Sequence, residues 1–134
     1  MAHNQEQAVA HEEVQVKTIL LVEDDANIGE VLLQAIAQET PHIAILVADG
    51  FAALNAIRGV KPHLFILDYH LPRMNGIELY DRLHTIPELE GVPTIMLSAH
   101  LPVQELKKRK ILGMPKPIDL DEFFQAIEQK LKSA

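Results

Sequence analysis

Hydrophobic residues recur along the chain in short uninterrupted runs, separated by segments of mixed polarity. Five runs have the length of a β-strand and lack the alternation of a half-exposed strand: "TILLV" (18–22), "IAILV" (43–47), "LFIL" (64–67), "TIML" (94–97) and "ILGM" (111–114). Uninterrupted apolar runs are typical of strands covered on both faces, as in a parallel sheet. The pattern therefore predicts a five-stranded parallel sheet with helices on both faces.

The segments between these runs have the spacing of amphipathic helices. Apolar residues recur at helical intervals at Ile28, Val31, Leu32, Ala35 and Ile36, at Leu54 and Ile57, at Ile77, Tyr80 and Leu83, and at Leu120, Phe123, Phe124, Ile127 and Leu131. Asn75 and Glu78 have the spacing of a capping box. The segment "HLPVQELKKRK" leaves room for a fourth helix of at most about three turns. We therefore predict a doubly wound (βα)5 domain of the α/β class, flavodoxin-like in its strand order 2-1-3-4-5, with a shortened fourth helix.

One domain accounts for most of the chain. Residues 1–16 are rich in Gln, Glu, Ala and His and show little periodicity, so we expect a flexible N-terminal tail there. Residues 17–134 carry the regular pattern, and the total of 134 residues suits a single domain with a real core.

Charge and composition narrow the function classes. The net charge of -7 disfavours nonspecific adhesion to nucleic acid, and we interpret the stretch "KKRK" (107–110) as a solvated helix face. The chain has no cysteine, which excludes disulfides, thiolate metal sites and cysteine nucleophiles. The apolar runs are too short to span a bilayer, and the N-terminus lacks the apolar core of a signal peptide. We expect a soluble cytoplasmic protein with no membrane contact.

Acidic residues gather where two predicted strands end. Glu23 and Asp24 follow the first strand and Asp68 follows the third, and these two strands are neighbours in the predicted order. Functional residues of parallel sheets collect at the carboxyl ends of the strands, and oxygen ligands of this kind suit Mg²⁺. Ser98 after strand four and Lys116 after strand five are expected at the same edge. Such a set can hold a metal, accept a phosphoryl group and neutralise its oxygens.

In this order, the motifs "LLVEDD", "LDYHLPRMNG", "LSA" and "KP" resemble the receiver domain of two-component response regulators, over about residues 17–132. The resemblance implies that Asp68 is the phosphoacceptor, taking its phosphoryl group from a phosphohistidine of a histidine kinase. It also implies a role for each of the other site residues. Mg²⁺ is bound by Asp24, by Glu23 through water, by Asp68 and by the main-chain carbonyl of His70, while Ser98 and Lys116 contact the phosphoryl oxygens.

Partners follow from the same resemblance. The phosphoryl donor is expected to be a sensor histidine kinase or a phosphotransfer protein, and the output partner is an unknown protein. We expect no DNA-binding domain in the chain, and a homodimer is left open. The protein is expected to catalyse only its own phosphorylation and dephosphorylation, and so is not an enzyme in the usual sense.

Two rival functions remain open. A degenerate receiver would act as a docking module that does not depend on phosphorylation. A phosphatase of the haloacid dehalogenase type would need a second aspartate two residues after the nucleophile, where this chain has His70. Receivers usually carry an aromatic residue three positions before the lysine, and here that position is Gly113. We therefore hypothesise altered signalling to the fifth strand, or a short fourth helix that becomes ordered only on phosphorylation or partner binding.

Overall fold

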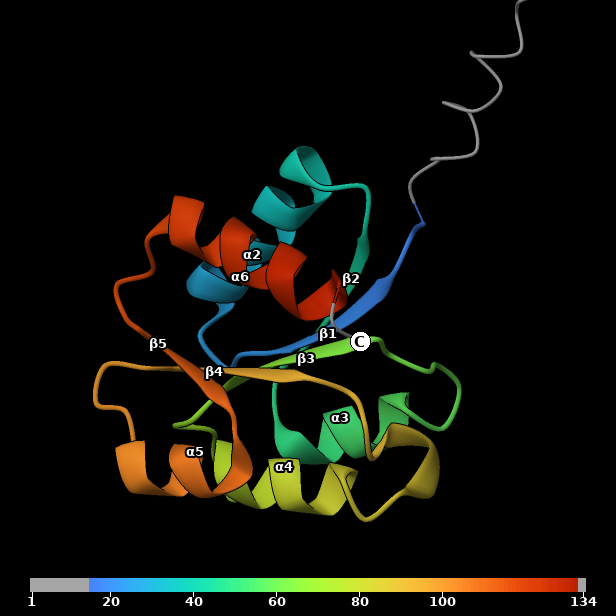
Figure 1. The fold of residues 1–134 in the computed structure, drawn as a ribbon, viewed down its shortest axis with the longest axis vertical. Coiled ribbons are helices and arrows are strands. Elements are labelled where there is room, and N and C mark those ends of the chain that lie inside the picture. The colour runs from blue at the N-terminus through green and yellow to red at the C-terminus, as the bar shows by residue number, and fades with distance from the viewer. Residues whose placement is uncertain (1–14, 133–134) are drawn as a thin grey trace, which may run out of the picture.

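Five parallel strands form the middle layer of the computed structural model, which describes residues 15–132 (Figure 1). In chain order the strands are β1 (Thr18–Val22), β2 (Ile43–Val47), β3 (Leu64–Asp68), β4 (Thr94–Ser98) and β5 (Leu112–Pro115). They pair in the order β2-β1-β3-β4-β5. This confirms the predicted fold class and strand order.

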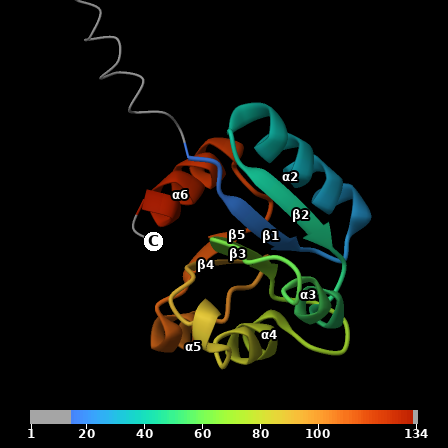
Figure 2. The ribbon, with the colours of Figure 1, turned by 90° about the vertical axis from the view of Figure 1, so that its right-hand side faces the viewer.

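Helices cover both faces of the sheet. They are α2 (Ala26–Glu39), α3 (Gly50–Ala56), α4 (Gly76–Leu83), α5 (Val103–Arg109) and α6 (Leu120–Lys132), with a short 3-10 helix at Pro87–Leu89. Helices α2 and α6 lie on one face, and α3, α4 and α5 lie on the other, as Figures 1 and 2 both show. None of these helices has the length and apolar content needed to cross a membrane. Helix α5, between β4 and β5, is the predicted fourth helix, and its length of seven residues confirms that this helix is short.

The predicted strand boundaries are nearly correct. The runs at 18–22 and 43–47 match β1 and β2, whereas β3 and β4 each extend one residue further, to Asp68 and Ser98. Strand β5 lies one residue later than predicted. The predicted tail falls mainly on residues 1–14, which lie outside the described residues, and the domain limits 17–134 stay a prediction.

The strands at the centre of the sheet bury side chains on both of its faces. In β1, Ile19 and Leu21 pack toward α2 and α6, whereas Leu20 and Val22 pack toward α3, α4 and α5. All four are at most 1% exposed. Burying an aliphatic side chain of this size contributes about 1.5–3 kcal/mol, so the central strands supply much of the stability and hold their carboxyl ends in fixed positions.

Short polar caps start the helices directly after the strands. The Asp25 carboxylate accepts hydrogen bonds from the Asn27 and Ile28 amides at 2.9 and 3.1 Å, which caps α2. At α4, the Asn75 side chain accepts from the Glu78 amide and the Glu78 side chain accepts from the Asn75 amide, which confirms the predicted capping box. These caps satisfy amides that the first helical turn leaves without partners.

Val31 does not lie on the buried face of its helix, although its spacing predicted that it would. The spacing placed Val31 with Leu32 on the inner face of α2, but Val31 is 59% exposed whereas Leu32 is 2% exposed. Successive helical residues are rotated by about 100°, so Val31 lies at the margin of the stripe. It borders a groove between α2 and the segment that leads from β5 into α6.

Arg109 of helix α5 forms an ion pair with helix α4. The Arg109 guanidinium donates to both carboxylate oxygens of Asp81, at 2.8 and 2.9 Å, and to the Glu105 carboxylate at 2.8 Å. The Arg109 side chain is 21% exposed, and bidentate pairs of this kind are stronger than ordinary surface ion pairs. The short helix is thus held by its side chains as well as by its own backbone.

Gly113 brings β5 close to α5. A Cβ atom at position 113 would lie 2.7 Å from Cδ1 of Leu106 and 3.1 Å from Cδ2 of Leu101. Two leucines therefore occupy the space beside β5 in which a side chain of residue 113 would begin. Whether α5 changes its order on phosphorylation stays a prediction.

Two histidines at the amino-terminal edge of the sheet accept hydrogen bonds from the start of β1. The Lys17 amide donates to Nδ1 of His42 at 3.1 Å, and the Thr18 amide donates to Nδ1 of His63 at 3.0 Å. Burial lowers the pKa of His42; Glu128 opposes this shift, whereas the Lys17 and His63 charges add to it. Accepting at Nδ1 requires this nitrogen to be unprotonated, so the fold favours neutral His42.

Replacing Gly76 should destabilise the fold. In Gly76→Ala the new Cβ would lie 2.7 Å from the backbone oxygen of Asp68 and 3.0 Å from Cα of Tyr69. We expect a loss of about 1–3 kcal/mol in the free energy of unfolding, measured by urea denaturation. The matched control is Gly59→Ala, because a Cβ there has nothing within 4 Å and should change stability by less than about 1 kcal/mol. Equal effects of the two substitutions would contradict the close approach.

His42 should make stability depend on pH. Because its pKa in the folded protein lies below the ordinary 6.5, the stability that neutral His42 contributes is fully present above pH 6.5 and is lost as the pH falls below it. His42→Asn places an amide oxygen near the position of Nδ1 and keeps the acceptor without titrating. Urea midpoints should therefore fall less from about pH 7.5 to about pH 5.5 in the variant than in the wild type. Identical curves would show that His42 does not contribute.

Candidate functional site

Three carboxylates meet at the carboxyl ends of β1 and β3. The two strands pair with Val22 opposite Leu67, so the next residues, Glu23 and Asp68, lie side by side. One carboxylate oxygen from each of Glu23, Asp24 and Asp68 lies within 4.8 Å of the others. Glu23 is 2% exposed and Asp68 is 3% exposed, whereas Asp24 is open to solvent. The predicted acidic cluster is therefore brought together, with two of its three members buried.

Lys116 follows the edge strand β5, and its side chain extends to the acidic cluster. Its Nζ donates to Oε1 of Glu23 at 2.9 Å and lies 3.4 Å from Oδ1 of Asp68. Burial works to lower the pKa of Lys116, but the hydrogen bond to Glu23 and the charge of Asp68 outweigh it and the pKa lies above its usual value. The ammonium group thus remains charged between the two buried carboxylates. The peptide bond from Lys116 to Pro117 is cis.

The surroundings of Asp68 raise the pKa of its carboxyl group. Burial, followed by the charge of Glu23 and a hydrogen bond shared with it, raises the pKa of Asp68 from 3.8 to about 7. Lys116 and the backbone amide of His70 oppose this shift. The His70 amide donates to Oδ1 of Asp68 at 3.3 Å, so the carboxylate is oriented by the loop that follows it. Asp68 is therefore a buried carboxylate that a second positive charge would stabilise strongly.

The donor set fits a hard divalent cation. Mg²⁺ prefers oxygen ligands and retains waters, and this cluster offers carboxylates on a partly solvated edge. The raised pKa of Asp68 shows that Lys116 alone does not offset the burial of the acidic pair. Glu23, Asp24 and Asp68 could therefore hold the metal, with the predicted carbonyl of His70 as a further ligand. Among residues 15–132, no other group of three such side chains has metal-binding geometry.

Ser98 lies at the same edge but faces its own loop. It is fully buried; its hydroxyl donates to the His100 carbonyl at 2.9 Å and accepts from the His100 amide at 3.0 Å. The Lys116 amide donates to the Ser98 carbonyl at 3.0 Å, which joins the loops after β4 and β5. Ser98 is therefore near the site, and its hydroxyl is engaged in a local turn.

The loop after β3 contains Arg73, which the sequence analysis did not identify as a residue near the site. Arg73 has a left-handed backbone with φ of 67°, which costs a non-glycine residue about 1–2 kcal/mol. Its guanidinium pairs with Asp49 at 2.7 Å and lies over the Phe51 ring. The only signal in the sequence is an arginine at a turn position between Pro72 and Gly76, where the chain has to reverse its direction.

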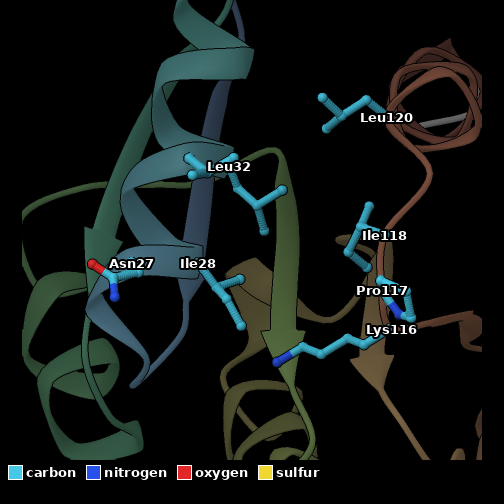
Figure 3. Close-up of a pocket in the computed structure, with 8 residues that line it drawn as sticks. Asn27, Ile28, Leu32, Lys116, Pro117, Ile118 and Leu120 are labelled. Carbon is cyan, nitrogen blue, oxygen red and sulfur yellow. The ribbon is translucent and has the colours of Figure 1, made fainter.

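An apolar groove of about 360 Å³ adjoins the site. Figure 3 shows it between α2 and the segment that leads from β5 into α6, with Lys116 at one end. Its lining consists of Asn27, Ile28, Val31, Leu32, Lys116, Pro117, Ile118 and Leu120. Val31 and Leu120 are 59% and 40% exposed, so the groove presents apolar surface next to the acidic cluster.

Comparison with known proteins identifies relatives of the whole domain. A family model described as the response regulator receiver domain matches residues 19–128. Sporulation initiation phosphotransferase F of Bacillus subtilis (strain 168) is 30% identical over 117 residues, which cover 84% of this chain and 92% of that protein. DNA-binding response regulator MtrA of Mycobacterium tuberculosis (strain ATCC 25618 / H37Rv) is 41% identical over 81 residues, which cover 60% of this chain and 34% of that protein. The match thus spans about a third of that relative.

Solved structures agree on the fold. A Vibrio cholerae chemotaxis protein superposes with a TM-score of 0.80 at 21% identity, covering 87% of this chain and 99% of the other. A CheY-like receiver domain protein from Methanospirillum hungatei gives a TM-score of 0.80 at 24% identity, over 89% and 96% of the two chains. At these identities the likeness establishes the fold alone. The family match, however, spans both the sheet and the acidic cluster at its carboxyl edge, and it shows that the chain belongs to the response regulator receiver domains of two-component signalling.

Proposed function

We propose that Asp68 is the phosphoacceptor of this receiver. The observation that carries the proposal is the position of Asp68: a buried carboxylate at the end of β3, within 3.4 Å of the Lys116 ammonium and clustered with Glu23 and Asp24. A nucleophile for phosphoryl transfer needs positioning and neutralisation of charge more than it needs covalent chemistry from its neighbours. The site supplies both.

In the proposed reaction, a carboxylate oxygen of Asp68 attacks the phosphorus of a phosphohistidine. The new oxygen–phosphorus bond forms while the bond from phosphorus to the imidazole nitrogen breaks, and its electron pair stays on that nitrogen. Lys116 is placed to pair with the transferred oxygens, because its Nζ already lies beside Oδ1 of Asp68. When bound, Mg²⁺ would offset the negative charge that gathers between the carboxylates and the phosphoryl group. Glu23 and Asp24 would serve by holding it.

Phosphorylation would compete with the local hydrogen bonds of Ser98. A phosphoryl group adds about -1.5 to -2 charge and strong acceptor oxygens. To donate to these oxygens, the Ser98 hydroxyl has to give up its bond to the His100 carbonyl. The loop after β4 is therefore the element whose conformation phosphorylation would change, in keeping with a switch that acts on a partner protein.

The two rival functions receive less support. A dehalogenase-type phosphatase lacks its general acid here, because His70 stands two residues after Asp68 and is exposed. A docking module without phosphorylation would not need a buried acidic pair matched to a lysine. We propose that the protein catalyses only its own phosphorylation and dephosphorylation, with a histidine kinase or phosphotransfer protein as donor, a separate output protein and a cytoplasmic location.

The groove beside the site is proposed to receive a helix of the phosphodonor protein. Lys116 belongs both to the groove lining and to the acidic cluster, so a helix in the groove would lie next to Asp68. The exposed apolar side chains Val31 and Leu120 are suited to packing against an amphipathic helix. The groove would thus bring a phosphohistidine to the acceptor.

Asp68→Asn should abolish phosphorylation, because the amide is not a nucleophile. Incubation of the wild type with acetyl phosphate and Mg²⁺ should add the mass of one phosphoryl group, and chelating the metal should prevent the gain. The control is Asp25→Asn, which keeps the cap of α2 and should be phosphorylated like the wild type. A phosphoryl group on the Asp68→Asn protein would overturn the assignment.

Val31→Asp should separate protein donors from small ones. A carboxylate in the groove should slow transfer from a phosphorylated histidine kinase or phosphotransfer protein by about 10-fold or more, because it disrupts the apolar contact. Phosphorylation by acetyl phosphate should be unchanged. Val103→Asp is the matched control, since Val103 is 53% exposed on α5, which lies on the other face of the sheet. Equal rates for the two variants with a protein donor would exclude the groove as the docking site.

A further inference from the structure

The loop of residues 69–75 follows the phosphoacceptor and supplies one of its hydrogen-bond donors, the His70 amide. The Tyr69 carbonyl accepts hydrogen bonds from the amides of Leu71 and Gly76, at 3.1 and 2.8 Å, which closes the loop on itself. Leu71 and Met74 are buried, at 8% and 5% exposure, and anchor its two sides. His70 is exposed and directs its amide at Asp68. The position of this loop therefore contributes to the orientation of the Asp68 carboxylate, together with Lys116 and Glu23.

Arg73 gives the loop an unfavourable backbone conformation. Within residues 15–132, two residues other than glycine have a positive φ: Arg73 at 67° and Lys110 at 59°. Lys110 is the C-cap of α5, where the left-handed conformation is common. Arg73 caps no helix; it is the central residue of a γ-turn, because the Met74 amide donates to the Pro72 carbonyl at 2.7 Å. The contacts of the Arg73 side chain hold this unfavourable turn in its place.

Those contacts join the loop to the first turn of α3. Nη2 of Arg73 lies 2.7 Å from Oδ2 of Asp49, and its guanidinium carbon lies 5.3 Å from the centre of the Phe51 ring. The other carboxylate oxygen of Asp49 accepts from the Ala52 amide at 2.8 Å, so one aspartate caps α3 and holds Arg73. Asp49 is itself mostly buried, with 22% of its side chain exposed, which makes it a firm anchor.

Met74, the next residue of the loop, also packs against the start of α3. A Cβ at Gly50 would lie 2.9 Å from Sδ of Met74, so the loop packs directly on the α3 backbone beside the arginine contact. Two successive residues of the loop, Arg73 and Met74, thus pack against the N-cap and the first turn of α3. The arrangement fixes the loop at the end opposite to His70.

We propose that Arg73 is a positioning residue for the phosphorylation of Asp68. By holding residues 69–75 against the start of α3, it keeps the His70 amide in place to orient the Asp68 carboxylate. The hydrogen bond from His70 to Asp68 is long, at 3.3 Å, so a small displacement of the loop breaks it. This inference rests on the proposed function of Asp68.

If Arg73 served only to stabilise the fold, its replacement would have a different effect. The Arg73 side chain is 64% exposed, and ion pairs at that exposure contribute little to stability. Glycine adopts a left-handed backbone without strain, so Arg73→Gly removes the contacts and relieves the strain together. Global stability and phosphorylation should therefore respond differently to this one substitution.

The test compares Arg73→Gly with the wild type. The urea midpoint should be unchanged or higher, whereas the rate of phosphorylation by acetyl phosphate should fall by about 10-fold, because the nucleophile loses its orientation. In the absence of Mg²⁺, the NMR signal of the His70 amide should shift towards the position of an amide without a hydrogen bond. Arg73→Lys keeps the ion pair and should recover most of the rate.

Two further variants sharpen the comparison. Asp49→Asn keeps an oxygen for the Ala52 amide but turns an amide group toward the guanidinium, so it should lower the rate as Arg73→Gly does. Arg58→Gly removes an exposed arginine just beyond α3 and should leave rate and His70 signal unchanged.

A wild-type rate and an unshifted His70 signal in Arg73→Gly would overturn the inference. So would a lower urea midpoint with an unchanged rate, because that result assigns Arg73 to stability alone. Failure of the proposed function is distinguishable: the wild type would then not be phosphorylated at Asp68, while the His70 signal in metal-free protein would still report whether Arg73 positions the loop.

Discussion

The site depends on placing two buried carboxylates side by side. Glu23 and Asp68 are adjacent because β1 and β3 are adjacent, and together they would repel each other without the ammonium of Lys116, 2.9 Å from the first and 3.4 Å from the second. The pKa of Asp68, raised to about 7, shows that this compensation is incomplete. A cation bound at this cluster would therefore be stabilised more than one bound at a cluster whose charges are already balanced.

The rest of the fold holds this arrangement in place. The β3 residues before Asp68 are fully buried, so the strand has no freedom to withdraw its terminal carboxylate from Glu23. Gly76 allows α4 to begin against the backbone of Asp68, and its amide closes the intervening loop on Tyr69. Lys116 arrives through the pairing of β5 with β4. The unfavourable charge cluster is thus maintained by apolar packing elsewhere in the sheet.

The sequence predicted most of the fold and which residues gather at the carboxyl edge of the sheet, because both follow from local patterns. Uninterrupted apolar runs marked the strands, and the polar residues after the first, third and fourth runs, Glu23, Asp68 and Ser98, fell at the carboxyl edge. The pattern placed Lys116 at this edge but did not give its hydrogen bond with Glu23, because which atoms meet depends on the side-chain conformations. Side-chain direction was equally hidden: Ser98 turns to His100, Val31 lies at the margin of its stripe, and Arg73 faces Asp49. Position along a strand can be read from a pattern, whereas rotamers depend on neighbours that tertiary packing supplies.

Gly113 bears on how a change at Ser98 reaches the outer face of the domain. A ring at position 113 has no room to enter, because even a Cβ would lie 2.7 Å from Leu106 and 3.1 Å from Leu101. Leu101 directly follows His100, the partner of the Ser98 hydroxyl, and Leu106 belongs to the helix that Arg109 fastens to α4. A side chain of the loop after β4 and a side chain of α5 therefore both lie over Gly113. In this receiver the space beside β5 is filled by side chains of the loop after β4 and of α5, so the structure leaves no room for an aromatic ring at position 113.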